Sequence, residues 1–410
     1  MASFRTAILL LTPAVLLAWV TVAAPGCPEH CECEHGTLIV NCSRLGLTRV
    51  PTAIPANVQQ LILENNNIAK VSRDNFRGLK SLQFLDLSSN QLNSEGIPAD
   101  AFDDVPSLQT LDLSDNRKFE DFPTYLPSQL MTLYFIQNSL KHVKKEAFAN
   151  LSDLIHLDIS YNGVESIAPG AFHNLSNLAV FYCDFNKLND NGIPTSVFQP
   201  ASKLSILGLR FNQLTRVPVD LPPGLEHLDL VGNKIVELPS RVFSNLTELQ
   251  TLEIWQQPSL TTIDDDAFAG LGKLQILDAT STGLNRVTGR TMDGLTGTWQ
   301  VYLSLNKIPA IPAGAFHDMK NLSSLWLDAN LITTLSPEVL DTSVLPRLSE
   351  VYLWGNPWTC DCHLRWLKEH IDNNNTAPTI QDPHLNVCNA PPKLKGRAFD
   401  TLSPNDFVCS

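Results

Sequence analysis

The most regular feature of this chain is a pattern of apolar positions, LxxLxLxxNxL, that recurs through almost its whole interior. Typical copies are LQFLDLSSNQL (82–92), LIHLDISYNGV (154–164) and LSSLWLDANLI (322–332). The alternating centre of each copy predicts a short strand with two leucines on one face and the intervening residues on the other. Because a single copy cannot bury its apolar face alone, we expect the copies to stack around one continuous core.

The asparagine of the motif marks each unit. Thirteen units follow one another at spacings of 21 to 26 residues, marked by Asn66, Asn90, Asn116, Asn138, Asn162, Asn186, Asn212, Asn233, Gln257, Thr282, Asn306, Asn330 and Asn356. We expect the amide to turn inward and bond backbone groups after the strand, which makes it structural rather than catalytic. Two units break the asparagine rule, at Gln257 and Thr282, and the following unit has Thr298 at a leucine position. These changes indicate tolerated sequence drift or, alternatively, a more loosely packed segment.

The segments that return from one strand to the next are of two kinds. Most follow xxIxxxAFxxLxxL, as in VESIAPGAFHNLSNL (164–178), and three are rich in proline: 50–61, 122–133 and 217–228. Proline fixes φ and removes a donor, so these three returns should be extended rather than helical. The sequence therefore predicts an α/β solenoid. Its curved parallel sheet forms the concave face, and irregular, extended or short helical returns form the convex side.

The residue between the two strand leucines defines a central column along the concave face, which is the usual recognition surface of a solenoid. Six of the thirteen positions are acidic and five are aromatic, and a flanking column adds Glu64, Asp184, Asp328, two tryptophans and Arg210. We take as candidate ligand-binding residues Asp86, Asp112, Tyr134, Asp158, Tyr182, Asp229, Glu253, Trp255, Asp278, Tyr302, Trp326, Tyr352 and Trp354. For any single aspartate the alternative to ligand binding is a solubilising role, because Asp is common in units of this type.

The aromatic members gather in the last five units. Trp255, Tyr302, Trp326, Tyr352 and Trp354 all fall on outward positions, and exposed Trp and Tyr are enriched at binding hot spots. The alternative is that they pack under the C-terminal end of the solenoid. We favour a binding role and expect a protein ligand with basic and apolar elements.

The beginning of the chain indicates its compartment. Arg5 precedes the apolar run 7–20 and the small residues TVAA, so residues 1–24 are predicted to be a secretory signal peptide. Because no later uncharged stretch of that length follows, we expect a soluble, exported protein without a membrane span. The formal net charge of -13 disfavours nucleic acid as a partner, because phosphates need a basic surface.

The nine cysteines form two clusters of four, near the start and at the end, with Cys183 alone between them. In an exported chain such clusters most often form disulfides, with zinc as the rival for the first one. Cys183 occupies the third leucine position of its unit, so we expect a buried, inert thiol rather than a nucleophile or an intermolecular bond. Glycosylation sequons fit the same route and lie at Asn41, Asn150, Asn174, Asn245, Asn321 and Asn374.

The cysteine clusters carry a family resemblance. CPEHCECEHGTLIVNC (27–42) and NPWTCDCHLRWL (356–367), with two later cysteines, resemble the N- and C-terminal caps of extracellular leucine-rich repeat proteins such as Slit, chondroadherin and lamprey variable lymphocyte receptors. The proline-type returns and the longer units with NSEGIPADAF (93–102) and NDNGIPTSVF (189–198) are similar to the small leucine-rich proteoglycans. The chain departs from that pattern because it has no Ser-Gly dipeptide and has a four-cysteine C-terminal cap.

The resemblance implies a domain plan and four disulfides. The plan is a signal peptide (1–24), an N-terminal cap (25–57), a repeat solenoid (58–356) and a C-terminal cap (357–410). The implied disulfide pairs are Cys27 with Cys33, Cys31 with Cys42, Cys360 with Cys388 and Cys362 with Cys409. In the C-terminal cap we expect Asp361 to cap a short helix whose apolar side carries Leu364, Leu367 and Ile371.

Motifs for catalysis or metal binding are not found in the sequence. It has no GxSxG, HExxH or Gly-rich phosphate loop, and we expect a non-enzymatic protein without cofactor or metal. Asp264–Asp266 lacks the spacing of a calcium loop and is read as a solvated turn. His156 and His227 lie on non-adjacent units, which disfavours a shared metal.

The function that this reading supports is protein binding in the extracellular matrix or at cell surfaces. The family resemblance implies collagen or other matrix proteins as partners. Recognition of immune or signalling ligands is the alternative, and a homodimer is a further possibility.

Overall fold

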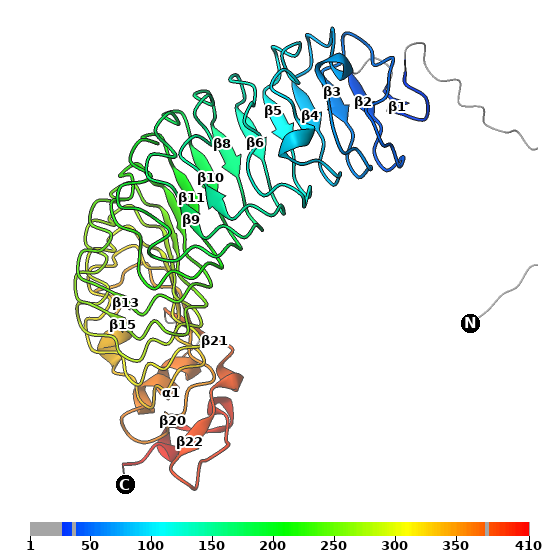
Figure 1. Cartoon of the computed structure of the whole chain (residues 1–410). Coiled ribbons are helices and arrows are strands. Elements are labelled where there is room, and N and C mark those ends of the chain that lie inside the picture. The colour runs from blue at the N-terminus through cyan, green and yellow to red at the C-terminus, as the bar shows by residue number, and fades with distance from the viewer. Residues whose placement is uncertain (1–26, 35–37, 374–376, 410) are drawn as a thin grey trace, which may run out of the picture.

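The structure, a computed structural model, describes residues 27–34, 38–373 and 377–409 as a curved solenoid. Its main element is a sheet of sixteen strands that follows the inside of the curve (Figure 1). The predicted signal peptide and Asn374 lie outside the described residues. Within the described ranges, no helix combines the length and apolar character needed to cross a membrane.

Thirteen parallel strands, one from each predicted unit, make up most of this sheet. They are β3 (Gln60–Ile62), β4 (Phe84–Asp86), β5 (Thr110–Asp112), β6 (Thr132–Tyr134), β8 (His156–Asp158), β10 (Val180–Tyr182), β11 (Ile206–Gly208), β12 (His227–Asp229), β14 (Thr251–Glu253), β16 (Ile276–Asp278), β17 (Gln300–Tyr302), β18 (Ser324–Trp326) and β19 (Glu350–Tyr352). Neighbouring strands pair without any shift in register, so equivalent positions of successive units lie side by side.

The leucines of the motif form the core, as the alternation predicted. Leu85, Leu111 and Leu133 pair along the middle of the sheet and are fully buried. The phenylalanines of the AF returns pack behind them, for example Phe172 against Phe181 with ring centroids 5.0 Å apart. Burying apolar surface at about 25 cal/mol per Å² is the main favourable term for such a fold.

Cys183 lies in this core, as expected. Its side chain is fully buried and its sulfur accepts from Asn186 Nδ2 at 3.3 Å. Burial raises the pKa of the Cys183 thiol well above its ordinary value, because an apolar surrounding disfavours the thiolate. The thiol is therefore an inert part of the packing.

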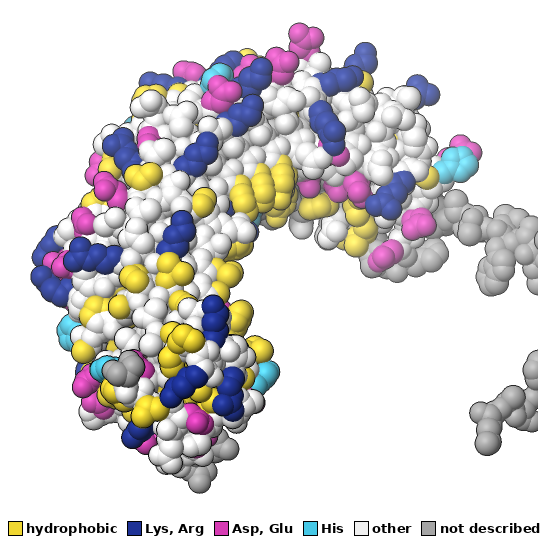
Figure 2. Space-filling view, turned by 90° about the horizontal axis from the view of Figure 1, so that it is seen from below, with side chains coloured by type: hydrophobic (Ala, Val, Ile, Leu, Met, Phe, Trp, Pro, Cys, Tyr) yellow, Lys and Arg dark blue, Asp and Glu magenta, His cyan; other side chains and the backbone are white. Residues whose placement is uncertain are grey.

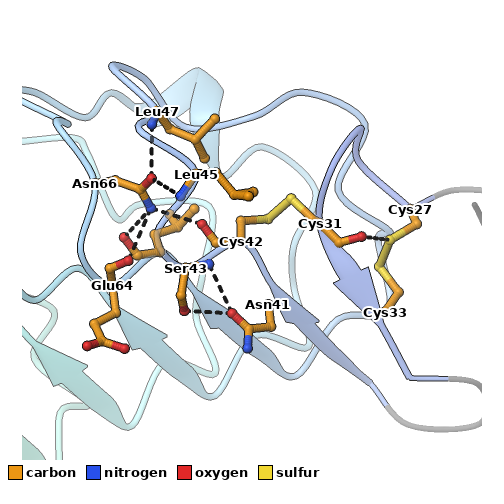
Figure 3. The surroundings of a disulfide bond; sticks show 11 residues. Cys27, Cys31, Cys33, Asn41, Cys42, Ser43, Leu45, Leu47, Glu64 and Asn66 are labelled. Atoms are coloured by element: carbon orange, nitrogen blue, oxygen red, sulfur yellow. Dashed lines mark hydrogen bonds between the residues drawn. A yellow bond between two sulfur atoms is a disulfide. The ribbon is translucent and has the colours of Figure 1, made fainter.

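The recurring asparagine turns inward and links three segments of backbone. Asn66 shows the arrangement (Figure 3): its amide nitrogen donates to the carbonyls of Cys42 and Leu63, each at 2.9 Å. Its amide oxygen accepts from the backbone N–H groups of Leu45 and Leu47. The same ladder continues through the later units, so each asparagine satisfies buried groups that would otherwise lack partners.

The two units without asparagine keep part of this bonding. Gln257 is fully buried, and its side chain accepts from the Ile235 N–H and donates to the Leu230 carbonyl. The Thr282 hydroxyl donates to the side-chain oxygen of Asn306 at 2.6 Å. Thr298, at its leucine position, is buried and donates to the Leu274 carbonyl at 2.9 Å. The longer Gln257 and the shorter Thr282 side chains thus make some of the hydrogen bonds that asparagine makes in the other units.

The convex side consists mainly of turns. Three short 3₁₀ helices occur there, η1 (Arg73–Asn75), η2 (Ser94–Gly96) and η3 (Pro337–Leu340). Two small parallel pairs are formed by β7 (His142–Val143) with β9 (Ser166–Ile167) and by β13 (Glu237–Leu238) with β15 (Thr262–Ile263). The three proline-rich returns contain no helix, in agreement with their fixed φ angles.

The N-terminal cap closes the first unit with two disulfides, Cys27–Cys33 and Cys31–Cys42 (Figure 3). Its strands β1 (Glu32–Cys33) and β2 (Ile39–Asn41) are antiparallel to each other, and β2 pairs parallel with β3. The repeat sheet therefore begins inside the cap. Both pairings are those that the family resemblance implied.

The C-terminal cap contains the α-helix α1 (Arg365–Asp372), with disulfides Cys360–Cys388 and Cys362–Cys409. The cap also holds β20 (Trp358–Thr359), β21 (Thr379–Gln381), β22 (Cys388–Ala390), η4 (Pro383–Leu385), η5 (Phe399–Thr401) and η6 (Pro404–Asp406). β21 extends the main sheet beyond β19.

The start of α1 differs from the sequence expectation. Its N-cap is Leu364, and Asp361 lies one turn earlier, where its carboxylate accepts from the His363 N–H at 2.9 Å. The expectation that Asp361 caps the helix was therefore wrong, because a turn over 362–364 separates the two. Leu364 and Leu367 are buried as expected, and Ile371 packs against the core from a half-buried position.

Candidate binding face

The in-register sheet brings all thirteen central positions into one column on the concave face. Asp158, for example, lies between Tyr134 and Tyr182, and Glu253 lies between Asp229 and Asp278. These side chains are half-buried, apart from the fully or nearly buried Gly208 and Asp229. Figure 2 shows hydrophobic and acidic side chains gathered along the inner side of the curve.

Three of the five predicted aromatic residues form one stack. The ring centroids of Tyr302 and Trp326 lie 4.0 Å apart and those of Trp326 and Tyr352 lie 4.8 Å apart, with interplanar angles of 19° and 6°. They occupy the central positions of β17, β18 and β19. Stacking restricts the rings, so they offer a preorganised flat surface at low entropic cost.

The other two tryptophans lie in the flanking column. The Trp255 indole N–H donates to the carboxylate of Glu253 at 3.2 Å, which ties it to the acidic part of the face. Trp354 is half-buried, two residues beyond Tyr352. The aromatic stack is thus Tyr302, Trp326 and Tyr352, and Trp255 lies apart from it.

The acidic residues of the N-terminal half share one environment. Burial raises the pKa values of Asp86, Asp112 and Asp158, although hydrogen bonds from serines two residues later oppose the change. Asp86, for example, accepts from the Ser88 N–H at 2.8 Å and from its hydroxyl at 2.6 Å. One oxygen of each carboxylate therefore accepts hydrogen bonds within the turn, and these acids are partly desolvated.

Arg210 lies in the middle of the concave face and neutralises part of its charge. Its guanidinium pairs with Asp229 and lies 3.6 Å from carboxylate oxygens of both Asp184 and Glu253. Burial, followed by repulsion from Asp229 and other carboxylates, raises the pKa of Asp184 to about 7, although bonds and charge from Arg210 oppose this. Asp229, which the sequence placed among the binding residues, is nearly fully buried and is paired with Arg210.

Gly208 makes room for this cluster. A Cβ at this position would lie 2.4 Å from Cδ1 of Tyr182 and 2.8 Å from Oδ1 of Asp184. The glycine therefore lets the ring of Tyr182 and the carboxylate of Asp184 lie over the strand of the next unit. Such a gap in the central column is readable from the sequence, but the residues that fill it are not.

One group of side chains on the concave face has the spacing of metal ligands, and an arginine lies against it. Ligand atoms of His227, Asp229 and Glu253 lie within 4.8 Å of one another, and Arg210 approaches both carboxylates. In the predicted turn at Asp264–Asp266, two of the carboxylates bond to side chains of the next unit. Asp265 accepts from the Thr288 hydroxyl, and Asp266 pairs with Arg290.

The two concave histidines have different surroundings. His156 lies between the rings of Tyr134 and Tyr182, at centroid distances of 5.3 and 5.8 Å, and burial lowers its pKa. His227 instead lies 3.7 Å from a carboxylate oxygen of Glu253. The two rings thus take part in separate clusters, as expected from their non-adjacent units.

A second group of stacked rings was missed by the sequence reasoning. Tyr161, Phe185 and Phe211 each occupy the position directly before the recurring asparagine, and their ring centroids lie 4.3 and 4.5 Å apart. The available signal was the presence of large aromatic residues at the same position in three consecutive units.

The predicted sequons lie at exposed or half-buried positions where the structure describes them. Asn150, Asn174, Asn245 and Asn321 lie on returns that precede strands, whereas Asn41 is the last residue of β2. The Asn174 and Asn321 side chains each donate to a backbone carbonyl of the preceding unit, at 2.7 and 3.0 Å. Their use as glycosylation sites stays a prediction.

Comparison with known proteins identifies the family. The leucine rich repeat family matches residues 56–117, 128–188, 223–284 and 298–357, together more than half of the chain. The chain therefore belongs to the leucine-rich repeat family. Its two cysteine-rich caps are disulfide-bonded, as in the extracellular members that it resembles.

Its relatives include small leucine-rich proteoglycans. The chain is 30% identical to mouse (Mus musculus) podocan over 336 residues, which are 82% of this chain and 50% of podocan. It is also 30% identical to chicken (Gallus gallus) keratocan over 253 residues, 60% of this chain and 69% of keratocan. The chain spans about half the length of podocan and of several other curated relatives that it matches.

A solved structure shares the fold over almost the whole chain. The leucine-rich repeat chain of FLRT2, in an octameric complex with Latrophilin 3 and Unc5D, is similar with a TM-score of 0.64 and 26% identity. The match covers 94% of this chain and 100% of that chain. The capped solenoid described above is therefore a fold known from experiment.

Proposed function

We propose that this chain is a secreted, non-enzymatic protein that binds other extracellular proteins through its concave face, with collagen as the foremost ligand. The observation that carries this proposal is the stack of Tyr302, Trp326 and Tyr352 in the central column. Aromatic residues on an open, rigid sheet are typical of binding hot spots. The kinship with podocan and keratocan, both matrix proteoglycans, supports a matrix ligand.

The chemistry of the face fits a collagen-like surface. Collagen presents proline rings and charged side chains on three extended chains, so flat apolar groups and cations are both available to a partner. The stack offers the flat apolar surface, and the acidic residues Asp86, Asp112 and Asp278 offer carboxylates for basic side chains. Electrostatic complementarity of this kind mainly sets association rate and specificity.

The alternative is recognition of an immune or signalling ligand. FLRT2, whose repeat chain shares this fold, is found in a complex with two other proteins, Latrophilin 3 and Unc5D. A concave face with both an aromatic and an acidic region would serve such a ligand equally well, so the ligand class has to be decided by binding.

A solid-phase assay with the purified mature protein tests the proposal. Fibrillar collagen, a panel of matrix proteins and microbial surface glycans are offered side by side, and bound protein is measured as the salt concentration rises. We expect collagen binding that weakens with salt, because the acidic column contributes screened attractions. Binding to the glycans alone would favour the immune alternative.

A further inference from the structure

The three rings of Tyr161, Phe185 and Phe211, which we name the aromatic rim, lie along the flank of the sheet where the chain leaves the strands. Neighbouring rings are nearly parallel, with interplanar angles of 9° and 19°. Tyr161 remains 52% exposed, and the other two rings are half-buried. The rim is separate from the stack of Tyr302, Trp326 and Tyr352, which lies at the centre of later strands.

Large aromatic residues are unusual at this backbone position. The φ angles of Tyr161, Phe185 and Phe211 are 56°, 54° and 51°, in the left-handed region that Gly, Asn and Asp tolerate best. Most equivalent positions of other units carry small or polar residues, namely Asn65, Ser89, Asp115, Gln137, Gly232, Gln256, Ser281, Ala329 and Gly355, and Leu305 is the other large apolar one. Neither the left-handed backbone conformation nor exposure to solvent therefore favours an aromatic residue at this position.

The surrounding backbone holds the rim in place. The N–H groups of Tyr161 and Phe185 donate to the carbonyls of Asp184 and Arg210 at 2.8 and 2.9 Å, which sets the register of the rings. The last ring lies against Gly232, where a Cβ would come within 2.5 Å of Phe211 Cδ1. The aromatic rim is thus held by backbone hydrogen bonds to the following units, and its last ring packs against the backbone of the next unit.

The rim borders the acidic centre of the concave face. Asp184 and Arg210 directly precede Phe185 and Phe211 in the chain, and Asp229 and Glu253 lie around the guanidinium of Arg210. Three carboxylates thus surround one cation, so this region keeps a negative charge that attracts a basic group. The sequons on the returns precede the strands, whereas the rim follows them, so glycans there would lie at the other strand ends.

We propose that the aromatic rim, together with the carboxylates beside it, is a second docking surface, for an extended protein segment that carries arginine between prolines. Proline rings in a polyproline II segment pack on aromatic strips without losing internal hydrogen bonds. An arginine guanidinium stacks on aromatic rings and pairs with carboxylates. The exposed ring edges, above all that of Tyr161, supply the surface for the proline rings. The carboxylates beside the aromatic rim supply the partners for arginine.

Labelled peptides serve as probes. Fluorescein-labelled Pro-Pro-Arg-Pro-Pro-Arg-Pro-Pro is titrated with the full mature chain by fluorescence anisotropy, beside one peptide with glutamate for arginine and one with glycine for proline. We expect the first peptide to bind at least about tenfold more tightly than either of the other two, because both stacking and charge contribute. Equal binding of all three peptides would overturn the proposal.

Serine substitutions locate the site. Phe185→Ser removes the middle ring and is structurally compatible, because Ser89 and Ser281 occupy equivalent left-handed positions. Leu305→Ser is the matched control, because it removes a side chain that is 57% exposed at the same position outside the rim. We expect Phe185→Ser to weaken peptide binding about tenfold and Leu305→Ser to leave it unchanged.

Two further readouts separate this proposal from its rivals. Trp326→Ala, a change in the other stack, should leave peptide binding intact; loss of peptide binding in this variant would place the site elsewhere. Sedimentation velocity shows whether a second copy of the chain covers the rim, and a dimer abolished by Phe185→Ser would overturn the peptide assignment. Collagen binding that persists without any peptide binding would refute the rim proposal while leaving the proposed function in place.

Discussion

Removal of one asparagine amide should destabilise the solenoid far more than removal of an adjacent exposed amide. Asn212 is 5% exposed and donates to the carbonyls of Cys183 and Leu209 at 2.8 and 3.1 Å. Its side-chain oxygen accepts from the Leu188 N–H at 2.9 Å. Asn212→Ala leaves a buried N–H and a buried carbonyl of neighbouring units unpaired. At about 1 to 3 kcal/mol for each of these two groups, we expect a loss of about 2 to 6 kcal/mol.

Urea denaturation followed by far-UV circular dichroism measures this loss, and amide hydrogen exchange shows where it acts. Gln213→Ala is the control, because Gln213 is the exposed neighbour of Asn212. Exchange should quicken first in the units around Cys183 and Leu209, because repeat proteins respond through nearest-neighbour contacts. A loss below about 1 kcal/mol for Asn212→Ala, or equal losses for both variants, would refute the role given to the amide ladder.

Three further predictions concern pH, glycine and the thiol. The raised pKa of Asp184, about 7, means that between about pH 4 and 7 the folded chain holds a proton that the unfolded chain releases. The free energy of unfolding should therefore fall as the pH rises through this range, with Asp184 contributing up to about 1.4 kcal/mol per pH unit. In pH-dependent urea melts Asp184→Asn should make this fall less steep, whereas Asp86, Asp112 and Asp158, whose pKa values are also raised, should retain their share of it. Gly270→Ala should destabilise the fold by about 2 to 4 kcal/mol in thermal melts, because its φ is 97° and a Cβ there would lie 2.6 Å from the Ser244 carbonyl oxygen. Gly289→Ala is the control and should be neutral, because a Cβ there meets no atom within 4 Å. Cys183 should resist a bulky thiol reagent until the chain unfolds; rapid modification of the native protein would contradict its burial.

The parts of the fold that depend on local periodicity were predictable from the sequence. The spacing of LxxLxLxxNxL placed each leucine in the core, put Cys183 among them and turned Asn66 and Asn90 inward. These assignments need only the pattern, because every unit repeats the same strand and turn. The disulfides of the caps came from family resemblance instead, because spacing alone leaves several pairings open.

The finer features of the candidate site depend on side chains in neighbouring units. Arg210 was recognised as the cation of its column, but its pairing with Asp229 depends on how two neighbouring units place their side chains. The position of Tyr182 and Asp184 beside it likewise depends on the space that Gly208 leaves. The aromatic rim was missed because its left-handed position reads as a turn, where large rings are not expected. The five C-terminal aromatic residues were grouped because they fall in the last five units, and only the structure separates the stacked Tyr302, Trp326 and Tyr352 from the other two.

The measurement that most directly tests the central claim is the affinity of the mature protein for fibrillar collagen, compared between Trp326→Ala and Trp299→Ala. Trp326 is the middle ring of the central stack, and Trp299 is 40% exposed outside the central column. Surface plasmon resonance should show binding by the unaltered chain that Trp326→Ala weakens about 30-fold, or about 2 kcal/mol, and that Trp299→Ala leaves unchanged. Equal affinities of the two variants, or no collagen binding by the unaltered chain, would contradict the account.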